Sequence, residues 1–345
     1  MARKIAVYNK KGGVAKTTDA VNLAASLAAM KKPDGSPKYR VLLNDMDPQQ
    51  DASNYLGVGS YFRSDEDENR DLGLVLKGEK SLSEVMYTYK AKEWVGPNTK
   101  GDDVYEVTEV TDFDEDGREI KVTRKYREVE IPNFKIVPAY TNIVMDKPPL
   151  DGNYVKLLRA MKAAGLDNQS HSEEYLDEDN FRASLDPFFM SEKLKEIEAD
   201  FDYIIFDCPP SWDRLSKMAV LASDQIIIPL TPGEFERIGV VRVMEQLVYL
   251  KRQYGKKPDL IFAVMNKIRG NVPRHIAYWK KNAKQLGGLM SDTGIPMTEE
   301  VTVSVMEQTP FGFTTSARFK NMRETFQQLA NEIEKKYQER EVRHV

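Results

Sequence analysis

The chain has 345 residues, 41% of them hydrophobic, which is enough apolar material for a large buried core. Its 50 basic and 54 acidic side chains give a net charge of −4, so any contact with nucleic acid is expected to come from a local patch rather than from the whole molecule. The single cysteine, the absence of an apolar run of membrane-spanning length and the lack of a signal-peptide pattern argue against disulfides, Cys-rich metal sites, membrane insertion and secretion, and favour a cytoplasmic protein.

Strongly apolar segments without polar alternation are predicted to be strands, at 4–8, 41–43, 134–137, 203–206, 225–230 and 260–264. Segments of helical periodicity alternate with them, at 16–30, 150–163, 213–222, 236–254, 273–285 and 316–339. This alternation is typical of a mostly parallel sheet with helices on both faces. The sequence therefore predicts one doubly wound α/β domain over residues 1–345, with its ligand at the carboxyl ends of the strands.

A glycine and lysine motif joins the first strand to the first helix. Its residues are Lys11, Gly12, Gly13, Val14, Ala15, Lys16, Thr17 and Thr18. Phosphates held here would face free backbone N–H groups at a helix N-terminus, and the two glycines let the backbone wrap closely around them. Lys16 can reach the β- and γ-phosphates, and the Thr17 hydroxyl can ligate Mg²⁺. The motif is therefore typical of a P-loop nucleotide site.

Two positions depart from the general G-x-x-x-x-G-K-[ST] pattern. Lys10 stands at the first glycine and Ala15 at the last. We expect Ala15 to be compatible with phosphate binding if its φ is negative, because the contact there comes from an amide.

Two carboxylates, Asp45 and Asp47, follow the second strand at the predicted ligand edge. One could bind the magnesium shell while the other orients an attacking water, as phosphoryl transfer requires. An Asp-x-Asp-Pro sequence is also typical of strand ends and helix caps, so this motif indicates phosphoryl-transfer chemistry only in combination with the phosphate loop.

Two segments interrupt the alternation of strands and helices. Residues 97–131 are predicted to insert a β-hairpin whose first arm is acidic and whose second is basic, so that pairing sets opposite charges side by side. This hairpin is either a solvated excursion or a contact for a partner or second subunit. Residues 167–186 are predicted to be a mobile acidic loop.

A third carboxylate, Asp207, ends the apolar strand 203–206 in the form of a Walker B motif, whose aspartate reaches Mg²⁺ through water. Its neighbour Cys208 is expected to be a small packing residue rather than a nucleophile. The phosphate loop and the two acidic motifs each follow a strand, and together they are specific for nucleotide hydrolysis.

Four motifs together resemble the ParA/MinD family of partition and positioning ATPases, which have a deviant Walker A loop. They are the phosphate loop, Asp-Met-Asp-Pro-Gln from Asp45, Asp-Cys-Pro-Pro-Ser from Asp207, and the pair Asn266-Lys267. Within the family the chain is most similar to the ParA branch without an N-terminal helix-turn-helix domain. The resemblance covers about residues 1–57, 133–145 and 200–339. It implies ATP and Mg²⁺ as cofactors and a homodimer that forms on ATP binding.

The resemblance also implies residue roles. Lys11 is the signature lysine that crosses to the phosphates of the partner subunit, and Lys16 and Thr17 take the ordinary Walker roles. Asp47 positions the attacking water, so the catalytic set is Lys11, Lys16 and Asp47. Thr17, Asp45 and Asp207 form the metal set. Besides residues 11–18, Asn266 and Pro296 are implied to bind ATP, on the adenine side.

The chain departs from the family pattern at three places. Ala15 replaces the usual glycine, Gln50-Asp51 stands where Gly-Asn is common, and Met297 stands where relatives have an arginine.

Partner expectations follow from the same resemblance: nonspecific double-stranded DNA, a ParB-like centromere-binding or adaptor protein that stimulates hydrolysis, and a nucleoid-associated location. The basic candidates for DNA contacts are Arg237, Arg242, Arg252, Lys256, Lys257, Arg269, Arg274, Lys280 and Lys281. Arg269, Arg274, Lys280 and Lys281 are the preferred set.

Three alternatives stay open. A MinD-like membrane-associated ATPase would need a terminal amphipathic helix, and residues 335–345 are too polar for one. ParA-like positioning of a non-DNA cargo is equally compatible with the motifs. A metabolic ATPase or amidase on the same fold is disfavoured by Lys11.

Overall fold

A computed structural model describes residues 1–59, 70–95, 100–101, 104–113, 119–140, 186–233 and 236–343. Its centre is an eight-stranded sheet in the order β3-β5-β2-β6-β1-β7-β8, in which β4 also pairs with β5. The strands are β1 (Arg3–Val7), β2 (Val41–Asp45), β3 (Tyr87–Val95), β4 (Val104–Phe113), β5 (Glu119–Val137), β6 (Tyr203–Asp207), β7 (Gln225–Leu230) and β8 (Leu260–Met265). All pairings among β2, β6, β1, β7, β8 and the end of β5 are parallel, which confirms the predicted doubly wound, mostly parallel fold.

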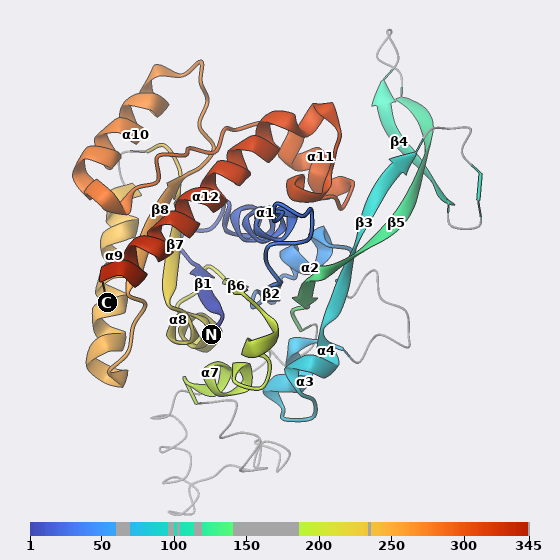
Figure 1. Ribbon diagram of the computed structural model, residues 1–345. Helices are drawn as coiled ribbons and strands as arrows, with labels where there is room; N and C mark the ends of the chain where they lie inside the picture. Colours follow the sequence, from blue (N-terminus) through green and yellow to red (C-terminus); the bar gives the residue numbers. More distant parts are fainter. Residues whose placement is uncertain are drawn as a thin grey trace, which may run out of the picture.

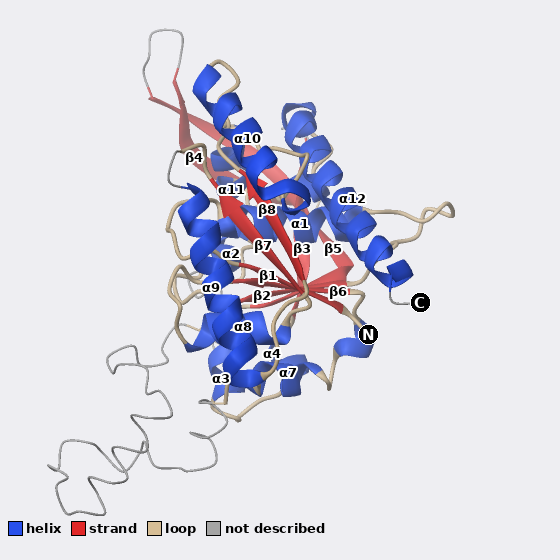
Figure 2. Ribbon diagram, turned by 90° about the vertical axis from the view of Figure 1, so that its left-hand side faces the viewer, coloured by secondary structure: helices blue, strands red, loops and turns tan. Residues whose placement is uncertain are grey.

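Helices cover both faces of this sheet (Figures 1 and 2). They are α1 (Lys16–Ala29), α2 (Asp51–Tyr55), α3 (Leu72–Leu76), α4 (Leu82–Val85), α7 (Phe189–Leu194), α8 (Arg214–Ala222), α9 (Glu236–Tyr254), α10 (Pro273–Leu286), α11 (Glu300–Met306) and α12 (Lys320–Arg343). Short 3-10 helices lie at Glu198–Asp200, Gly287–Leu289, Phe311–Phe313 and Ala317–Phe319.

The two core layers explain why the middle of each central strand is apolar on both faces. Ile5 and Val7 of β1 pack with α1 and α12 on one face of the sheet. Ala6 and Tyr8 belong to the other layer, with α3, α4, α7, α8 and α9. Because successive strand side chains point to opposite faces, a strand covered on both sides needs apolar residues throughout.

The inserted region differs from the prediction in its connection to the sheet. β4 and β5 pair antiparallel, and the register sets Glu106 opposite Lys125. The segment 134–137, expected to be a separate strand, is the end of the 19-residue β5 and pairs parallel with β2. β3, which the sequence did not indicate, pairs antiparallel along β5. These three strands extend beyond the rest of the sheet as an arm (Figure 1).

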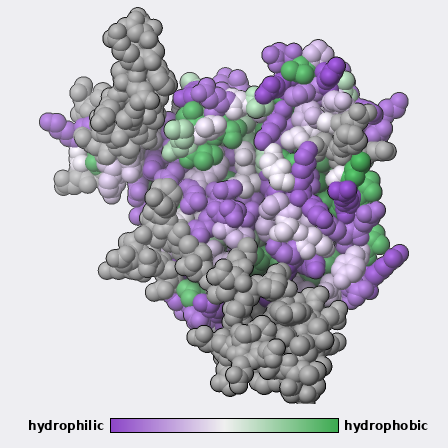
Figure 3. Space-filling view, turned by 180° about the vertical axis from the view of Figure 1, so that it is seen from behind, coloured by the Kyte–Doolittle hydropathy of each residue, from purple (hydrophilic) through white to green (hydrophobic). Residues whose placement is uncertain are grey.

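Several predicted segments lie outside the described residues. They are the helix at 150–163, the acidic loop 167–186 apart from Asp186, and the hairpin turn at 114–118. Among the helices that the structure does describe, none is long and apolar enough to cross a membrane. Seen from behind, the described surface is mostly hydrophilic, and its apolar side chains gather in small patches (Figure 3).

Candidate active site

The phosphate loop and the two acidic motifs meet because their strands are neighbours. β6 lies between β2 and β1, and the register pairs Asp207 with both Val7 and Asp45. Parallel strands end at the same edge of a sheet, so the loop after Val7 and the two aspartates share one site. The backbone N–H of Met46 donates to the Asp207 carbonyl oxygen at 2.9 Å and fixes the second motif beside the third.

The phosphate loop runs from residue 8 into the first turn of α1, and the two lysines of its motif, Lys11 and Lys16, lie in different environments. Lys11 is exposed, whereas Lys16 is only 8% exposed. The Lys16 ammonium donates to the Lys11 carbonyl oxygen at 3.3 Å. Burial lowers the pKa of Lys16, and the nearby carboxylates of Asp207 and Asp47 oppose that shift. Lys16 therefore points into the loop, where a phosphate chain would lie.

Asn9 braces this loop, a role that the sequence did not reveal. Its side-chain amide donates to the Pro229 carbonyl oxygen at 2.7 Å, and its Oδ1 accepts the backbone N–H of Lys11 at 3.0 Å. Asn9 is almost fully buried, so it ties the loop to the end of β7. No local pattern distinguishes such an asparagine from an ordinary loop residue.

Ala15 does not meet the condition of a negative φ under which it was expected to be compatible with phosphate binding. Ala15 has φ 77° and ψ 29°, in the left-handed region, directly before α1. Gln50, the other position where relatives commonly have glycine, is also left-handed, with φ 60°. A β-carbon in this conformation costs roughly 1–2 kcal/mol. The backbone therefore keeps the shape that suits glycine although the side chains have changed.

Asp45 organises the turn that carries Asp47. Its Oδ1 accepts the Asp47 backbone N–H at 3.0 Å, and its Oδ2 accepts the backbone N–H and the hydroxyl of Ser53 at 2.9 and 2.6 Å. Burial raises the pKa of Asp45 to about 7, although these donors oppose the shift. Much of its acceptor capacity is thus used inside the protein.

Asp47 lies in the same turn, where it is buried with 7% exposure, and its Oδ1 accepts the Gln49 backbone N–H at 3.0 Å. Burial raises the pKa of Asp47, and the Lys16 ammonium lowers it. This arrangement places a carboxylate beside the phosphate loop with a second oxygen to bind water.

Asp207 is fully buried, and neither of its carboxylate oxygens makes a well-formed hydrogen bond to any described residue. Burial and then the neighbouring Asp45 carboxylate raise its pKa, whereas the Thr17 hydroxyl lowers it. Two buried carboxylates beside one another favour a bound cation, and carboxylate and hydroxyl oxygens suit Mg²⁺. The residues therefore fit a magnesium ion.

No group of three His, Cys, Asp or Glu residues within the described ranges could hold a metal by itself. Mg²⁺ usually binds one or two protein ligands and completes its shell with water and substrate phosphates, so Thr17 and Asp207 would hold it only together with a bound nucleotide.

Asn266, predicted to lie near the adenine, directly follows the strand β8 and is almost fully buried. Its amide nitrogen donates to Asp19 Oδ2 at 2.7 Å. The following Lys267 donates to the Gly13 carbonyl oxygen at 2.7 Å, which links this segment to the phosphate loop. Pro296 pairs with Ile268, so the two segments that resemble base-binding regions lie side by side.

The preferred basic residues come from two neighbouring segments. Arg269 precedes α10, and its Nε is 3.1 Å from the sulfur of Met297. Arg274, Lys280 and Lys281 are exposed on α10. α10 carries no acidic residue, and its inner face packs through Ile276 and Trp279.

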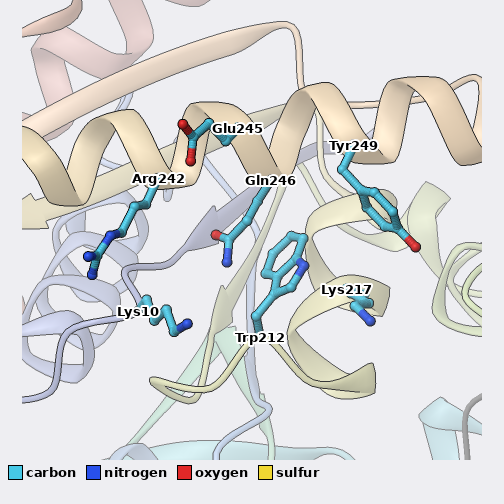
Figure 4. A pocket seen from close by; sticks show the side chains of 7 residues that line it. All are labelled: Lys10, Trp212, Lys217, Arg242, Glu245, Gln246 and Tyr249. Atoms are coloured by element: carbon cyan, nitrogen blue, oxygen red, sulfur yellow. The ribbon is translucent and has the colours of Figure 1, made fainter.

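A pocket of about 530 Å³ lies beside the phosphate loop (Figure 4). It is lined by Lys10, Trp212, Lys217, Arg242, Glu245, Gln246 and Tyr249. Figure 4 shows Arg242, Gln246 and Tyr249 projecting from α9 toward the side of the opening that carries Lys10, Trp212 and Lys217. Trp212 packs on Tyr8 with ring centroids 5.2 Å apart.

Cys208, which follows Asp207 in the chain, is fully buried. Burial raises the pKa of its thiol, which fits a packing residue rather than a nucleophile.

Comparison with known proteins places this geometry among nucleotide-dependent partition and positioning proteins. A family model described as an AAA domain matches residues 2–164 and 170–261. The chromosome partitioning protein ParA of Myxococcus xanthus is 26% identical over 290 residues, covering 81% of this chain and 73% of that protein. The sporulation initiation inhibitor protein Soj of Bacillus subtilis is 28% identical over 233 residues, covering 67% of this chain and 58% of that protein.

Solved structures share the fold at lower identity. The septum site-determining protein MinD of Pyrococcus horikoshii, complexed with Mg-ADP, matches with a TM-score of 0.57 and 19% identity over 96% of each chain. An ATP complex of a McdA variant from Cyanothece matches with a TM-score of 0.58 and 14% identity, over 95% of this chain and 96% of the other.

Proposed function

This chain belongs to the ParA/MinD family of P-loop ATPases, and from that premise we propose that it acts as an ATP-dependent homodimer that binds DNA without sequence specificity and segregates or positions a plasmid, a chromosome region or another cargo. A ParB-like partner would stimulate hydrolysis. The observation that carries the proposal is the different placement of the two motif lysines: Lys16 is buried where the phosphates would lie, whereas Lys11, next to the exposed Lys10, faces outward. A second, outward lysine suits phosphates bound by another subunit.

The chemistry assigned to each side chain follows from the site. Lys16 and the loop amides would hold the phosphate chain, and Thr17 and Asp207 would hold Mg²⁺, which neutralises charge on the phosphates during transfer. The free oxygen of Asp47 would orient the attacking water. Asp45 would act in two indirect ways. It fixes the turn that carries Asp47, and its carboxylate beside Asp207 adds negative charge near the metal.

The dimer contact is proposed to include the exposed apolar face of α9. Ile238, Val241 and Val248 are 44%, 48% and 48% exposed and recur at helical spacing, and Tyr249 beside them is 45% exposed. The pocket lined by Lys10 and Tyr249 joins this face to the phosphate loop. A second copy of the chain that received Lys11 would therefore also cover this apolar face.

The DNA contact is proposed to lie on the outer face of α10. Arg274, Lys280, Lys281 and Lys284 project away from the buried side of that helix, with no carboxylate among them. Phosphate contacts of this kind give affinity without sequence preference and weaken as salt rises. Because the whole chain has a net charge of −4, electrostatic attraction to DNA would come from this basic patch rather than from the whole molecule.

A gel shift with random double-stranded DNA tests the function. We expect a shift with ATP but not with ADP, no shift for Lys16→Ala, and a persistent complex for Asp47→Ala, which binds ATP without hydrolysing it. A Lys280→Ala/Lys281→Ala variant should lower the slope of log affinity against log salt by about 2. DNA binding that ignores ATP would contradict the proposal.

Two other outcomes identify the alternatives. ATP-dependent sedimentation with anionic vesicles and no DNA shift would indicate a MinD-like membrane ATPase. An ATP dimer that binds neither DNA nor vesicles would indicate positioning of a non-DNA cargo.

A further inference from the structure

The carboxyl of Asp19 lies in the first turn of α1, is 1% exposed, and has no role in the chemistry described above. Its only side-chain hydrogen bond among the described residues joins Asp19 Oδ2 to the Asn266 amide nitrogen at 2.7 Å. A buried carboxyl is costly, so its single contact, to a residue 247 positions away at the base side of the site, calls for a functional reason.

The surroundings of Asn266 determine which way its amide points. The same amide nitrogen lies 3.4 Å from the Val264 carbonyl oxygen, which can only accept a hydrogen bond. The NH₂ end therefore belongs on the side of Asp19 and Val264. Asn266 Oδ1 is left on the other side, buried and without a hydrogen-bond partner in the described part of the chain.

We propose that Asp19 is a positioning residue for base selection: it fixes the Asn266 amide so that Oδ1 accepts a hydrogen bond from the exocyclic amino group of adenine. The inference rests on the proposed ATP site. Adenine carries an amino donor at C6, whereas guanine carries a carbonyl acceptor there. An acceptor fixed in a buried site pairs with the amino group of adenine but is left unpaired against the carbonyl group of guanine. The site therefore discriminates against guanine nucleotides.

The test measures ADP and GDP binding by calorimetry, because diphosphate binding needs neither the dimer nor hydrolysis. Wild type should bind ADP at least about tenfold more tightly than GDP. Asp19→Leu keeps a branched side chain of similar shape but removes the acceptor, and we expect the ratio of the two dissociation constants to fall by about tenfold, mainly through weaker ADP binding. Asp19→Asn, which keeps an oxygen facing Asn266, should retain the ratio within about twofold.

If the role of Asp19 is purely structural, Asp19→Leu should weaken the binding of ADP and GDP equally and leave the ratio of their dissociation constants unchanged. That result would overturn the inference. If Asp19→Leu does not fold, Asp19→Ala is measured in its place with the same expectation. A wild-type chain that binds ADP and GDP equally well contradicts the inference alone, whereas one that binds no nucleotide contradicts the proposed function itself.

Discussion

Single residues of the site are held in conformations and environments that cost the unliganded protein stability. Ala15 and Gln50 occupy the left-handed region. Asp207 is a buried carboxyl without a well-formed hydrogen bond to any residue that the structure describes. Such costs are common where a ligand completes the interactions that the empty site lacks. Both kinds of cost predict substitutions that stabilise the protein.

Ala15→Gly should stabilise the unliganded protein by about 1 kcal/mol, because glycine adopts a positive φ without a steric penalty. The measurement is the midpoint of urea unfolding at unchanged m-value. Gly13→Ala is the matched control, since Gly13 has φ 72° and nothing within 4 Å of an added Cβ, so it should lose a similar amount. A lower urea midpoint for Ala15→Gly than for the wild type would contradict a strained backbone at Ala15.

Asp207→Asn should stabilise the unliganded protein at pH 8 by about 1–3 kcal/mol. Burial and the Asp45 carboxylate raise the pKa of Asp207, so the wild type loses stability as pH rises from the unfolded-state pKa of about 4 through the folded-state value. The gain should therefore shrink toward pH 4. Thermal unfolding across this range measures it, and the variant should also lose its additional stabilisation by Mg²⁺ with ATP. A gain that does not change with pH would rule out ionisation of Asp207 as its cause.

At the scale of elements, the close contacts of α1 fix the site from behind. The 3-10 helix at Phe311–Phe313 packs on α1, and Asn22 Oδ1 accepts the Phe311 backbone N–H at 2.9 Å. A Cβ on Gly312 would lie 2.5 Å from the Ala25 carbonyl oxygen. Only glycine allows this approach without moving the backbone.

Gly312→Ala should therefore destabilise the protein by about 1–3 kcal/mol, as overpacking does. Gly270→Ala is the control, because nothing lies within 4 Å of its added Cβ and its φ is not positive. Denaturant unfolding compares the two. Equal effects would show that the contact with α1 is not the cause.

The long elements could be predicted from the sequence and the short ones could not. The predicted 236–254 coincides with α9, and the predicted 16–30 ends one residue beyond α1, because both carry several turns of helical periodicity. α3 and α4, of five and four residues, are too short to show a period. β5 was divided because Glu128, Glu130, Pro132 and Asn133 interrupt the apolar pattern between its arm and its buried end.

The same distinction applies to the site. Residues 11–18, Asp45, Asp47 and Asp207 are recognised because strand ends and glycines mark them in the chain. Asn9, Asp19 and Ser53 act through partners distant in sequence or through tertiary burial. Their contacts become visible only when the sheet has brought the segments together.

At the scale of the whole molecule, the phosphate loop and the apolar face of α9 would together form one subunit's half of the proposed dimer interface. Val241→Glu should weaken ATP-dependent dimerisation by tenfold or more, because it buries a charge in an apolar contact. Val305→Glu, a similarly exposed valine on α11, is the control of equal charge. Sedimentation velocity over a concentration series measures both, and equal dimerisation of the two variants would remove α9 from the interface.

The most direct test of the central claim is the mass of the protein in solution with a non-hydrolysable ATP analogue. The account predicts a dimer for the wild type with the analogue and a monomer with ADP. Lys11→Ala should bind the analogue and remain a monomer, whereas Lys16→Ala should fail to bind it. A Lys11→Ala protein that dimerises like the wild type, or a wild type that stays monomeric with the analogue bound, would contradict the claim that the exposed lysine of this loop joins two subunits.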